Sequence, residues 1–532
     1  MTLGHEVKIG FKRTATADGF ARTKLVTLEG EAPLGEAPKS FESLAAFIHL
    51  SDLHVCDSQS PARLEFLDRY ADPDYETRKQ VDYVGTYRAQ EFLSLQVVEA
   101  MVQAANRVTQ GPLGGAKIDA VFLTGDVIDN GQFNELSWYK RLMEGGSVSS
   151  ASGSEHAVEG VQAESWPDEH FYQPNAENTQ RVLEKFGLPS VHGLAEKAQA
   201  EFMATGLKHP WLAIHGNHDA LLQGVATPNE ELNSLATGEA KLSGLAQGTD
   251  LMKVFAEFTE VGPAVYPPLS TMETRSVTPD ANRRLVEIED WVNIHTNCGH
   301  DHGLTQALPR QAHYYRDFGD VRLIALDTVN HFGGWQGCIH REQFEWLKVL
   351  LEESTDKYVM LTSHHPLQDL FNGYVPEGVE APALTAEVES LLLGYSNVIL
   401  WVAGHVHDHS ISAVRQSNGE VGFWQIRTTS HIDWPQQGRT VEVLRTDDGH
   451  IVIGTVVLDH AGPVLRDNDC VADYVADGRI DSAVGLAGIS RYLAANDWQR
   501  VDGSQRLEIL EGQPEDRNAW LWMRDPLAAS RI

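Results

Sequence analysis

The 532-residue chain is poor in cysteine and in long apolar segments, and each shortage excludes a class of protein. Its four cysteines (Cys56, Cys298, Cys338 and Cys470) have no paired spacing, which favours ordinary thiols in a reducing compartment over a disulfide framework. No run of about 18 apolar residues occurs, so no membrane span is expected. Because the first thirty residues also lack the apolar core of a signal peptide, we expect a cytoplasmic protein.

Basic side chains are also scarce relative to acidic ones. The chain has 42 Lys and Arg residues against 75 Asp and Glu residues, a formal net charge of −33 at pH 7. A field of this sign repels long polyanions, so we expect no nucleic-acid partner. A small phosphate ester is still compatible with this charge, because bound metal cations can reverse the potential locally.

Short apolar segments that end in polar clusters are the main pattern in the chain, and such segments are typical of buried strands. They run through residues 45–50, 118–123, 211–214, 321–326, 358–361, 398–402 and 422–426. Apolar residues spaced three to four apart predict helices at 87–108, 342–351, 385–393 and near 484–494. A turn at Asp447-Asp448-Gly449 predicts a late hairpin of residues 440–444 and 451–458. Strands that alternate with helices predict an α/β layered fold.

The layout of these patterns favours one large catalytic domain at residues 41–465. An N-terminal extension (1–40) precedes it, and a C-terminal extension (466–532) is expected to pack on its core. Long insertions at 131–210, with a helical region near 176–203, and at 220–312 interrupt the pattern. Loops of this length are typically functional caps or disordered inserts.

The second insertion contains two groups of residues with open interpretations. The cluster of His295, Cys298, His300 and His302 fits no zinc-site spacing, so a polar lid is favoured over a third metal site. Arg283 and Arg284 form either a phosphate clamp or, more commonly, a solvated surface pair.

Histidine, aspartate and asparagine residues directly follow five of the expected strands. In open α/β sheets, functional residues gather beyond the carboxyl ends of the strands, on the loops. The five clusters are Asp52-Leu53-His54, Gly125-Asp126-Val127-Ile128-Asp129, Gly216-Asn217-His218-Asp219, His364-His365-Pro366 and Gly404-His405-Val406-His407. Carboxylate, imidazole and amide groups are ligands of hard or borderline divalent metals. The sequence therefore predicts a metal site at this edge.

The order Asp-x-His, Gly-Asp-x-x-Asp, Gly-Asn-His-Asp, His-x-Pro, Gly-His-x-His resembles that of the calcineurin-like metallophosphoesterases. This superfamily includes purple acid phosphatases, class III cyclic nucleotide phosphodiesterases and nucleases of double-strand-break repair. The resemblance spans residues 44–460 and implies a layered β-sandwich flanked by helices. It also implies a dinuclear centre.

The resemblance assigns the ligands residue by residue. Asp52, His54 and His407 would bind one metal ion, Asn217, His364 and His405 would bind the other, and Asp126 would bridge the two. The ions would be Mn, Fe or Zn. His218 would contact the substrate phosphate and protonate the leaving group. Asp129 stands where purple acid phosphatases have a metal-bound tyrosine, so no purple charge-transfer band is expected.

Several neighbours of these ligands are candidates for supporting roles. Asp129 is expected to orient loops or a ligand, and Asp219 is the alternative hydrogen-bond partner of His218. The side chain of His365 should point away from that of His364, because neighbours on an extended backbone alternate. His431 is a candidate to reach the site from its rim, whereas His215 and His409 are expected behind the ligands or at the surface.

The resulting functional prediction is a hydrolase acting on phosphoric ester bonds. Its substrate would be a small soluble phosphodiester or phosphomonoester. A catalytically silent scaffold of the same fold is an alternative, although such proteins typically lose several of the residues that this chain retains. A nuclease is the third interpretation, disfavoured by the negative charge.

Overall fold

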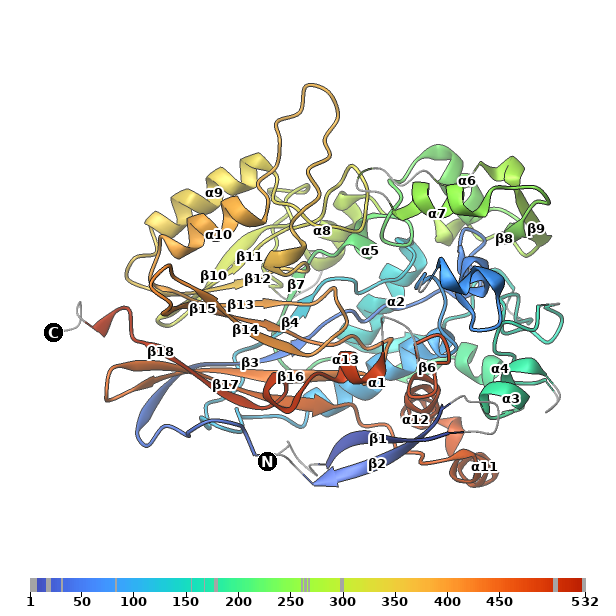
Figure 1. The fold of residues 1–532 in the computed structure, drawn as a ribbon, viewed down its shortest axis with the longest axis horizontal. Coiled ribbons are helices and arrows are strands. Elements are labelled where there is room, and N and C mark those ends of the chain that lie inside the picture. Colours follow the sequence, from blue (N-terminus) through green and yellow to red (C-terminus); the bar gives the residue numbers. More distant parts are fainter. Residues whose placement is uncertain are drawn as a thin grey trace.

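The computed structural model describes residues 7–528, apart from residues 16–20, 30–31, 82–83, 155, 167, 177–179, 260–261, 263–265, 267, 297–300 and 501–505. Two six-stranded sheets form its centre (Figure 1). In the first sheet the order is β18 (Ala519–Arg524), β17 (His450–Asp459), β16 (Gln437–Thr446), β3 (Phe41–Leu50), β4 (Ala120–Thr124) and β7 (Trp211–Ile214). Strands β3, β4 and β7 are parallel, and the others pair antiparallel.

The second sheet is also parallel in its middle and antiparallel at its edges. Its order is β10 (Tyr314–Phe318), β11 (Val321–Ala325), β12 (Tyr358–Thr362), β13 (Val398–Ala403), β15 (Val421–Arg427) and β14 (Ser410–Arg415). Strands β11, β12, β13 and β15 run parallel. The predicted strands and the late hairpin are therefore confirmed, and the α/β fold with a layered pair of sheets is as expected.

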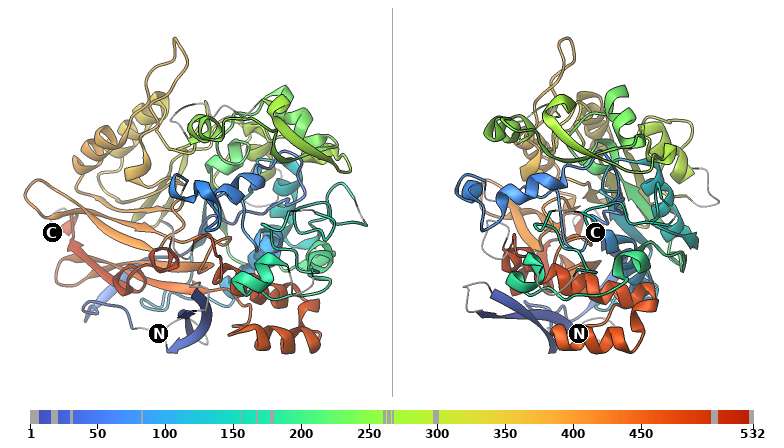
Figure 2. Two further views of the ribbon diagram at one scale, coloured as in Figure 1. Left: turned by 45° about the vertical axis from the view of Figure 1, so that its right-hand side comes forward. Right: turned by 90° about the vertical axis from the view of Figure 1, so that its right-hand side faces the viewer.

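Helices cover the outer faces of both sheets (Figures 1 and 2). Helices α9 (Arg341–Glu352) and α10 (Thr385–Leu393) lie over the second sheet, close to their predicted bounds. Helices α1 (Ser94–Ala105) and α12 (Ala483–Ala494) pack against each other beside the first sheet. The helix predicted at 87–108 is wrong at its start, because the Glu91 carboxylate accepts a hydrogen bond from the Arg88 amide and holds this segment as a loop and a short 3-10 turn.

The insertions contain short elements that gather at one end of the molecule (Figure 1). Residues 131–210 hold α2 (Phe133–Glu144), β5 (Gly146–Val148), α3 (Arg181–Phe186), α4 (Leu194–Gln199) and β6 (Phe202–Ala204). Residues 220–312 hold α6 (Glu230–Thr237), β8 (Ala240–Leu245), α7 (Leu251–Thr259), β9 (Met272–Ser276) and α8 (Ile288–Thr296), and α5 (Asn217–Ala220) precedes them. Apolar residues of α3, α4, α6, α7 and β8 share a cluster with the C-terminal helices, whereas those of α2 and α8 belong to the main core. The proposed domain boundaries stay a prediction.

The N-terminal and C-terminal segments add further elements around the two sheets. A hairpin of β1 (Val7–Ala15) and β2 (Ala21–Glu29) lies beside the C-terminal helices in Figures 1 and 2. The C-terminal segment contains α11 (Asn468–Ala476), α12, α13 (Leu507–Glu511) and β18, which extends the first sheet by pairing with β17. Among the residues that the structure describes, no helix has the length and apolar character of a membrane span.

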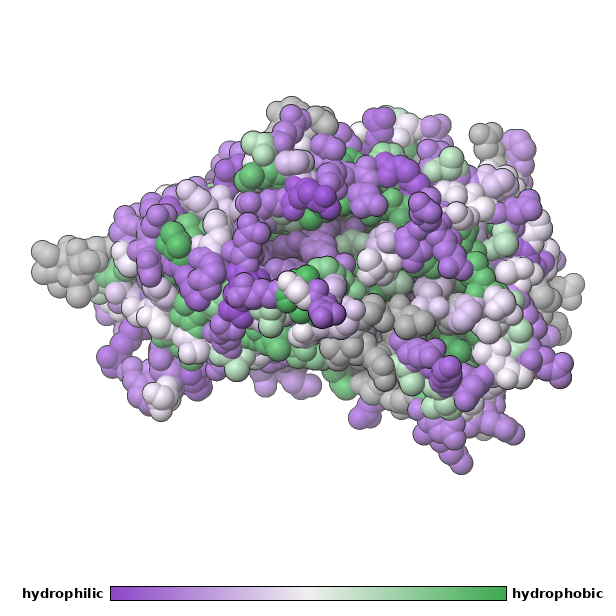
Figure 3. All heavy atoms as spheres, turned by 90° about the horizontal axis from the view of Figure 1, so that it is seen from above, coloured by the Kyte–Doolittle hydropathy of each residue, from purple (hydrophilic) through white to green (hydrophobic). Residues whose placement is uncertain are grey.

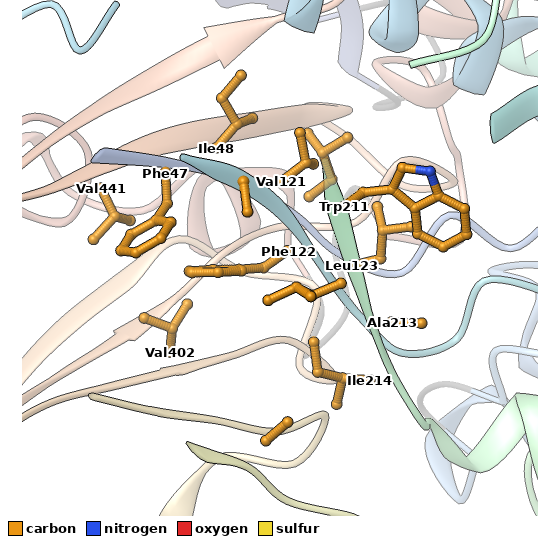
Figure 4. Packing of buried hydrophobic residues seen from close by; sticks show 14 of the residues in the cluster. Phe47, Ile48, Val121, Phe122, Leu123, Trp211, Ala213, Ile214, Val402 and Val441 are labelled. Carbon is orange, nitrogen blue, oxygen red and sulfur yellow. The ribbon is translucent and has the colours of Figure 1, made fainter. Parts of the chain in front are cut away.

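The main core fills the space between the two sheets. Phe47 of β3 packs on Phe122 of β4 with ring centroids 4.5 Å apart, and on Phe318 of β10 at 5.1 Å, edge to face. Figure 4 shows Phe47, Phe122 and Val402 converging in this layer. Because β10 belongs to the other sheet, these contacts fix the sheets relative to each other.

We expect the substitution Phe47→Ala to destabilise the chain by about 3–5 kcal/mol, because it removes a fully buried ring that joins the two sheets. Chemical denaturation followed by tryptophan fluorescence measures the change. Val349→Ala is the control, because Val349 is 55 % exposed on α9 and should alter stability by less than about 0.5 kcal/mol. Equal effects of the two substitutions would contradict the assignment of Phe47 to the inter-sheet core.

Candidate metal centre

Loops that follow strands of both sheets bring the predicted ligands together. Asp52 and His54 follow β3, Asp126 follows β4, Asn217 follows β7, His364 follows β12, and His405 and His407 follow β13. The loops are joined by backbone hydrogen bonds. The Asp52 amide donates to Gly125 O at 3.2 Å, and the Gly404 amide donates to His364 O at 2.9 Å. The site thus lies where carboxyl ends of the two sheets meet.

The backbone at five of the seven predicted ligands is left-handed. The φ angles are 50° at Asp52, 44° at His54, 49° at Asp126, 71° at His405 and 62° at His407. Such a conformation costs a non-glycine residue about 1–3 kcal/mol and persists only where the surrounding structure imposes it. Because strained residues of this kind concentrate at binding and catalytic sites, the backbone itself marks these loops as a functional site.

The first group of donors contains Asp52, His54 and His407. Nε2 of His54 lies 3.2 Å from Nε2 of His407, which in turn lies 3.3 Å from Asp52 Oδ1. Each histidine uses its Nδ1–H to donate to a carboxylate, His54 to Asp129 at 2.9 Å and His407 to Asp433 at 2.6 Å. The two Nε2 atoms therefore face each other across a short gap, where one cation could bind both of them.

The second group surrounds His364. Its Nδ1–H donates to Thr124 O at 2.8 Å, so Nε2 of the neutral ring carries a lone pair. That nitrogen faces Asn217 Oδ1 at 2.9 Å, His405 Nδ1 at 3.1 Å and Asp126 Oδ2 at 3.1 Å. The Asn217 amide donates to Gly224 O at 2.9 Å, which fixes its oxygen toward the site. Burial lowers the pKa of His364, but the carboxylates of Asp126 and Asp52 raise it to about 9.

These separations fit two metal ions. With metal–ligand bonds of about 2.0–2.1 Å, neighbouring ligand atoms of one ion lie about 2.9–3.4 Å apart. Asp126 Oδ2 lies between the groups, 3.1 Å from His364 Nε2 and 3.8 Å from His54 Nε2. The donor set of carboxylate, imidazole and amide oxygen matches what such ions bind.

The comparison with protein families bears on the same residues. Residues 190–409 match the family described as calcineurin-like phosphoesterase. This segment, rather than the whole chain, is therefore similar to a calcineurin-like phosphoesterase domain. The match includes Asn217, His218, His364, His405 and His407, whereas Asp52, His54 and Asp126 precede it.

Comparisons with individual proteins give weaker similarity. A dimetal phosphatase from Danio rerio has a solved structure that matches this chain with a TM-score of 0.27 and 14% sequence identity. The similarity covers 79% of this chain and 100% of that one. A search of curated proteins finds no match.

Buried charges hold the two histidines of the first group. Asp129, behind His54, forms an ion pair with Arg63, which also contacts Glu91 at 2.8 Å. Asp433, behind His407, binds Arg88 at 2.8 Å and Arg500 at 3.0 Å. Carboxylates placed in this way fix the ring orientation and raise the basicity of the ligand nitrogen.

The sequence pointed to Asp129, but it did not point to the other charged residues behind His54 and His407. Asp433 carries a usable signal, because it follows β15 just as the predicted ligands follow their own strands. Arg63, Arg88 and Arg500 carry none. They lie in loops without regular spacing, and only tertiary contacts bring them behind the site.

His218 lies beside the first group, with its ring centroid 4.6 Å from that of His54. Its Nδ1 bonds to Asp129 O at 2.5 Å, and no hydrogen bond joins it to Asp219 among the described residues. Burial lowers the pKa of His218 to about 4. The ring is therefore neutral at neutral pH in the metal-free chain, with Nε2 unprotonated.

Asp219, His365 and His431 occupy structural positions around the centre. Asp219 accepts hydrogen bonds from the Gly216 amide at 2.8 Å and the Val127 amide at 2.9 Å, and so ties two ligand loops together. His365 bonds through both nitrogens, to Trp335 O and to the Thr328 hydroxyl, each at 2.9 Å.

His431 and His409 are buried rather than at the rim or the surface. Nδ1 of His431 bonds to Ser51 O at 2.8 Å, behind Asp52. His409 accepts from Arg439 at 2.7 Å. Both rings lie where strand ends are packed tightly, which no sequence pattern shows.

The groups singled out in the second insertion lie elsewhere. His295 and His302 pack around Trp211, and their partners Cys298 and His300 fall outside the described residues. Arg283 is fully buried and binds Asp57 at 3.1 Å, so the expectation of a solvated pair is wrong for this residue. Arg284 pairs with Asp290 at 2.7 Å.

A cavity of about 520 Å³ opens onto the predicted metal centre. Its floor includes His54, Asp126, Asn217, His218, His405 and His407. Its walls combine the apolar side chains of Val84, Val225, Phe255 and Trp335 with Arg88, Arg427 and Arg500. The face of the molecule seen from above is mostly hydrophilic, with hydrophobic residues scattered over it (Figure 3).

We expect Gly404→Ala to weaken metal binding by about 5–150-fold, the equivalent of 1–3 kcal/mol of overpacking. A Cβ at this position would overlap the Ser51 hydroxyl and the Asp52 carboxylate. Isothermal titration of the metal-free chain with Zn²⁺ measures the affinity. Gly373→Ala is the matched control, because its Cβ would meet only Leu384 at 3.5 Å. Unchanged affinity in Gly404→Ala would show that the close approach of these loops is not needed.

We expect Asp433→Asn to lower metal affinity by about 10–100-fold, because His407 loses the carboxylate that orients its ring. The same titration tests this, with circular dichroism to verify folding. Asp448→Asn is the control, since Asp448 forms a comparable but exposed pair with His450 at 3.1 Å. If both variants bind metal as the parent chain does, Asp433 has no supporting role.

Proposed function

We propose that the chain hydrolyses a small phosphate ester at a dinuclear metal centre. The observation that carries this proposal is the convergence of seven donor side chains, of which five have left-handed backbone and five line one cavity. The first ion is assigned to Asp52, His54 and His407, and the second to Asn217, His364 and His405. Asp126, whose Oδ2 lies 3.1 Å from His364 Nε2 and 3.8 Å from His54 Nε2, would contribute to both sites.

Two ions held by these residues would supply the Lewis acidity for the reaction, lowering the pKa of a bound water molecule and neutralising charge on the phosphate oxygens. The chain's own part is to hold the donors in place. Asp129 and Asp433 orient the histidines of the first group, and Gly224 O orients the Asn217 amide. Both sheets contribute predicted ligands, so the packing between the sheets also fixes the positions of these ligands relative to one another.

His218 is assigned to the substrate. Its bond to Asp129 O fixes one nitrogen as a donor to the backbone and leaves Nε2 for the ester. Protonation of Nε2 beside a bound phosphate would supply the proton that the leaving alcohol needs. Because burial keeps the free ring neutral, the substrate's negative charge must favour this proton.

The walls of the cavity favour a small ester with an apolar part. Val84, Val225, Phe255 and Trp335 provide apolar contact. The wall arginines have carboxylate partners. Arg427 forms a two-pronged pair with Asp408, and Arg88 and Arg500 share Asp433. Most charge neutralisation at the phosphate would therefore fall to the metal ions. Phosphodiesters and phosphomonoesters are both compatible with this arrangement.

The two alternative functions have less support. A nuclease must attract a polyanion, and the net charge of −33 opposes this. A silent scaffold has no need of a complete donor set or of the strained backbone that presents it.

The reaction is tested with metal-free protein resupplied with Mn²⁺, Zn²⁺ or Fe²⁺ and two chromogenic esters, a nitrophenyl phosphomonoester and a bis-nitrophenyl phosphodiester. We expect metal-dependent turnover, and the preferred ester separates phosphatase from phosphodiesterase. Tight binding of two ions without turnover of either ester would favour the scaffold.

We expect His218→Ala to reduce kcat by about 10²–10⁴-fold on an alkyl phosphate, whose leaving group needs a proton, and much less on the nitrophenyl ester. Metal content should stay unchanged, as measured by mass spectrometry of the bound metals. His192→Ala, at an exposed position in the first insertion, is the control. Equal losses on both esters would assign His218 to phosphate binding rather than to proton donation.

A further inference from the structure

A second cluster of metal-binding side chains lies outside the seven predicted ligands. His215 follows β7, Asp327 follows β11, and His331 lies in the loop after Asp327. Their ligand atoms all lie within 4.8 Å of one another. Asp327 Oδ2 is 2.8 Å from His331 Nε2, and Asp327 Oδ1 is 3.6 Å from His215 Nδ1.

The state of His215 is the unusual feature of this cluster. Its side chain is 1 % exposed, and neither of its ring nitrogens has a hydrogen-bond partner among the residues that the structure describes. Burying unpaired polar atoms costs about 1–3 kcal/mol each. The ring of Trp291 lies 5.1 Å away on one side and offers it no acceptor. His215 therefore holds a buried ring nitrogen 3.6 Å from the Asp327 carboxylate without a hydrogen bond between them.

The spacing of His215 and Asp327 suits coordination better than hydrogen bonding, whereas His331 lies within hydrogen-bond distance of Asp327. A gap of 3.6 Å between His215 and Asp327 is too long for a hydrogen bond. Two ligands of a tetrahedral ion, with bonds of about 2.0–2.1 Å, lie about 3.4 Å apart. Two imidazoles and one carboxylate form a common zinc ligand set, with a fourth position left for water.

We propose that His215, Asp327 and His331 bind a third divalent cation of the zinc class, separate from the dinuclear centre.

The surroundings supply the charge and the access that such an ion needs. Burial raises the pKa of Asp327, but His331 and His215 hold it well below its usual range. The carboxylate is therefore ionised. The His331 side chain is 32 % exposed, which gives the ion a route from solvent. Without an ion, a His331–Asp327 pair satisfies those two residues but leaves His215 unpaired.

The position of this site suggests a structural role beside the catalytic cavity. The ion would join the ends of β7 and β11, which belong to different sheets, to the loop after β11. That loop carries Trp335, whose ring stacks on His405 with centroids 5.8 Å apart and whose carbonyl bonds to His365. Binding at the third site would thus hold one wall of the cavity in place.

The test is the number of metal ions bound by the full chain after loading with Zn²⁺ and dialysis, measured by plasma mass spectrometry. We expect about one equivalent fewer in His331→Ala and in Asp327→Asn than in the parent chain. Asp327→Asn preserves the shape of the side chain, so it covers the case in which His331→Ala perturbs the loop. His450→Ala removes a histidine from an exposed His–Asp pair and should bind as many ions as the parent.

Equal metal content in the parent chain and both cluster variants would overturn the proposal. So would a variant that loses every ion, because the cluster would then support the dinuclear centre rather than bind its own cation. The one-equivalent difference does not depend on ester turnover, so the third site and the proposed hydrolysis succeed or fail separately.

Discussion

The close approach of metal-binding side chains at the junction of the two sheets is the constraint on which the rest of the structure depends. Nε2 of His54 faces Nε2 of His407, and Nε2 of His364 faces three acceptor atoms, with the two carboxylates of Asp52 and Asp126 between them. Nothing but positive charge stabilises such an arrangement in a buried place. The proton that Asp126 and Asp52 favour on His364 in the metal-free chain reflects the same demand.

The fold meets this demand by bringing loops closer than ordinary side chains allow. Left-handed residues turn the chain just after the strands, and Gly404 lets its loop approach Asp52 without overlap. Asp219 ties the loops after β4 and β7 together. Buried arginines in turn hold Asp129 and Asp433 as anions behind the ligands. The strain in the loops is thus balanced by packing and ion pairs one layer further out.

The cluster of His215, Asp327 and His331 extends the same principle to the wall of the cavity. Each of its members follows a strand or lies in a loop next to one, yet the three point to a different place from the seven predicted ligands. An ion there would link the loop that carries Trp335 to the ends of strands in both sheets. The chain would then use one kind of chemistry twice, for the reaction and for the shape of the space in which the reaction occurs.

The sequence by itself determined the strands, the α/β class and the five clusters of the candidate centre, because apolar runs and the residues after them are local features. It also located Asp129. It could not find Arg63 or the pairing of His215 with Asp327, since these residues are far from their partners in the chain and meet them only after the sheets pack. It misplaced the start of α1 for the same reason: the contacts of Glu91 with Arg88 and the distant Arg63 override a helical pattern. Local periodicity encodes elements, whereas burial and long-range charge pairing exist only in the tertiary structure.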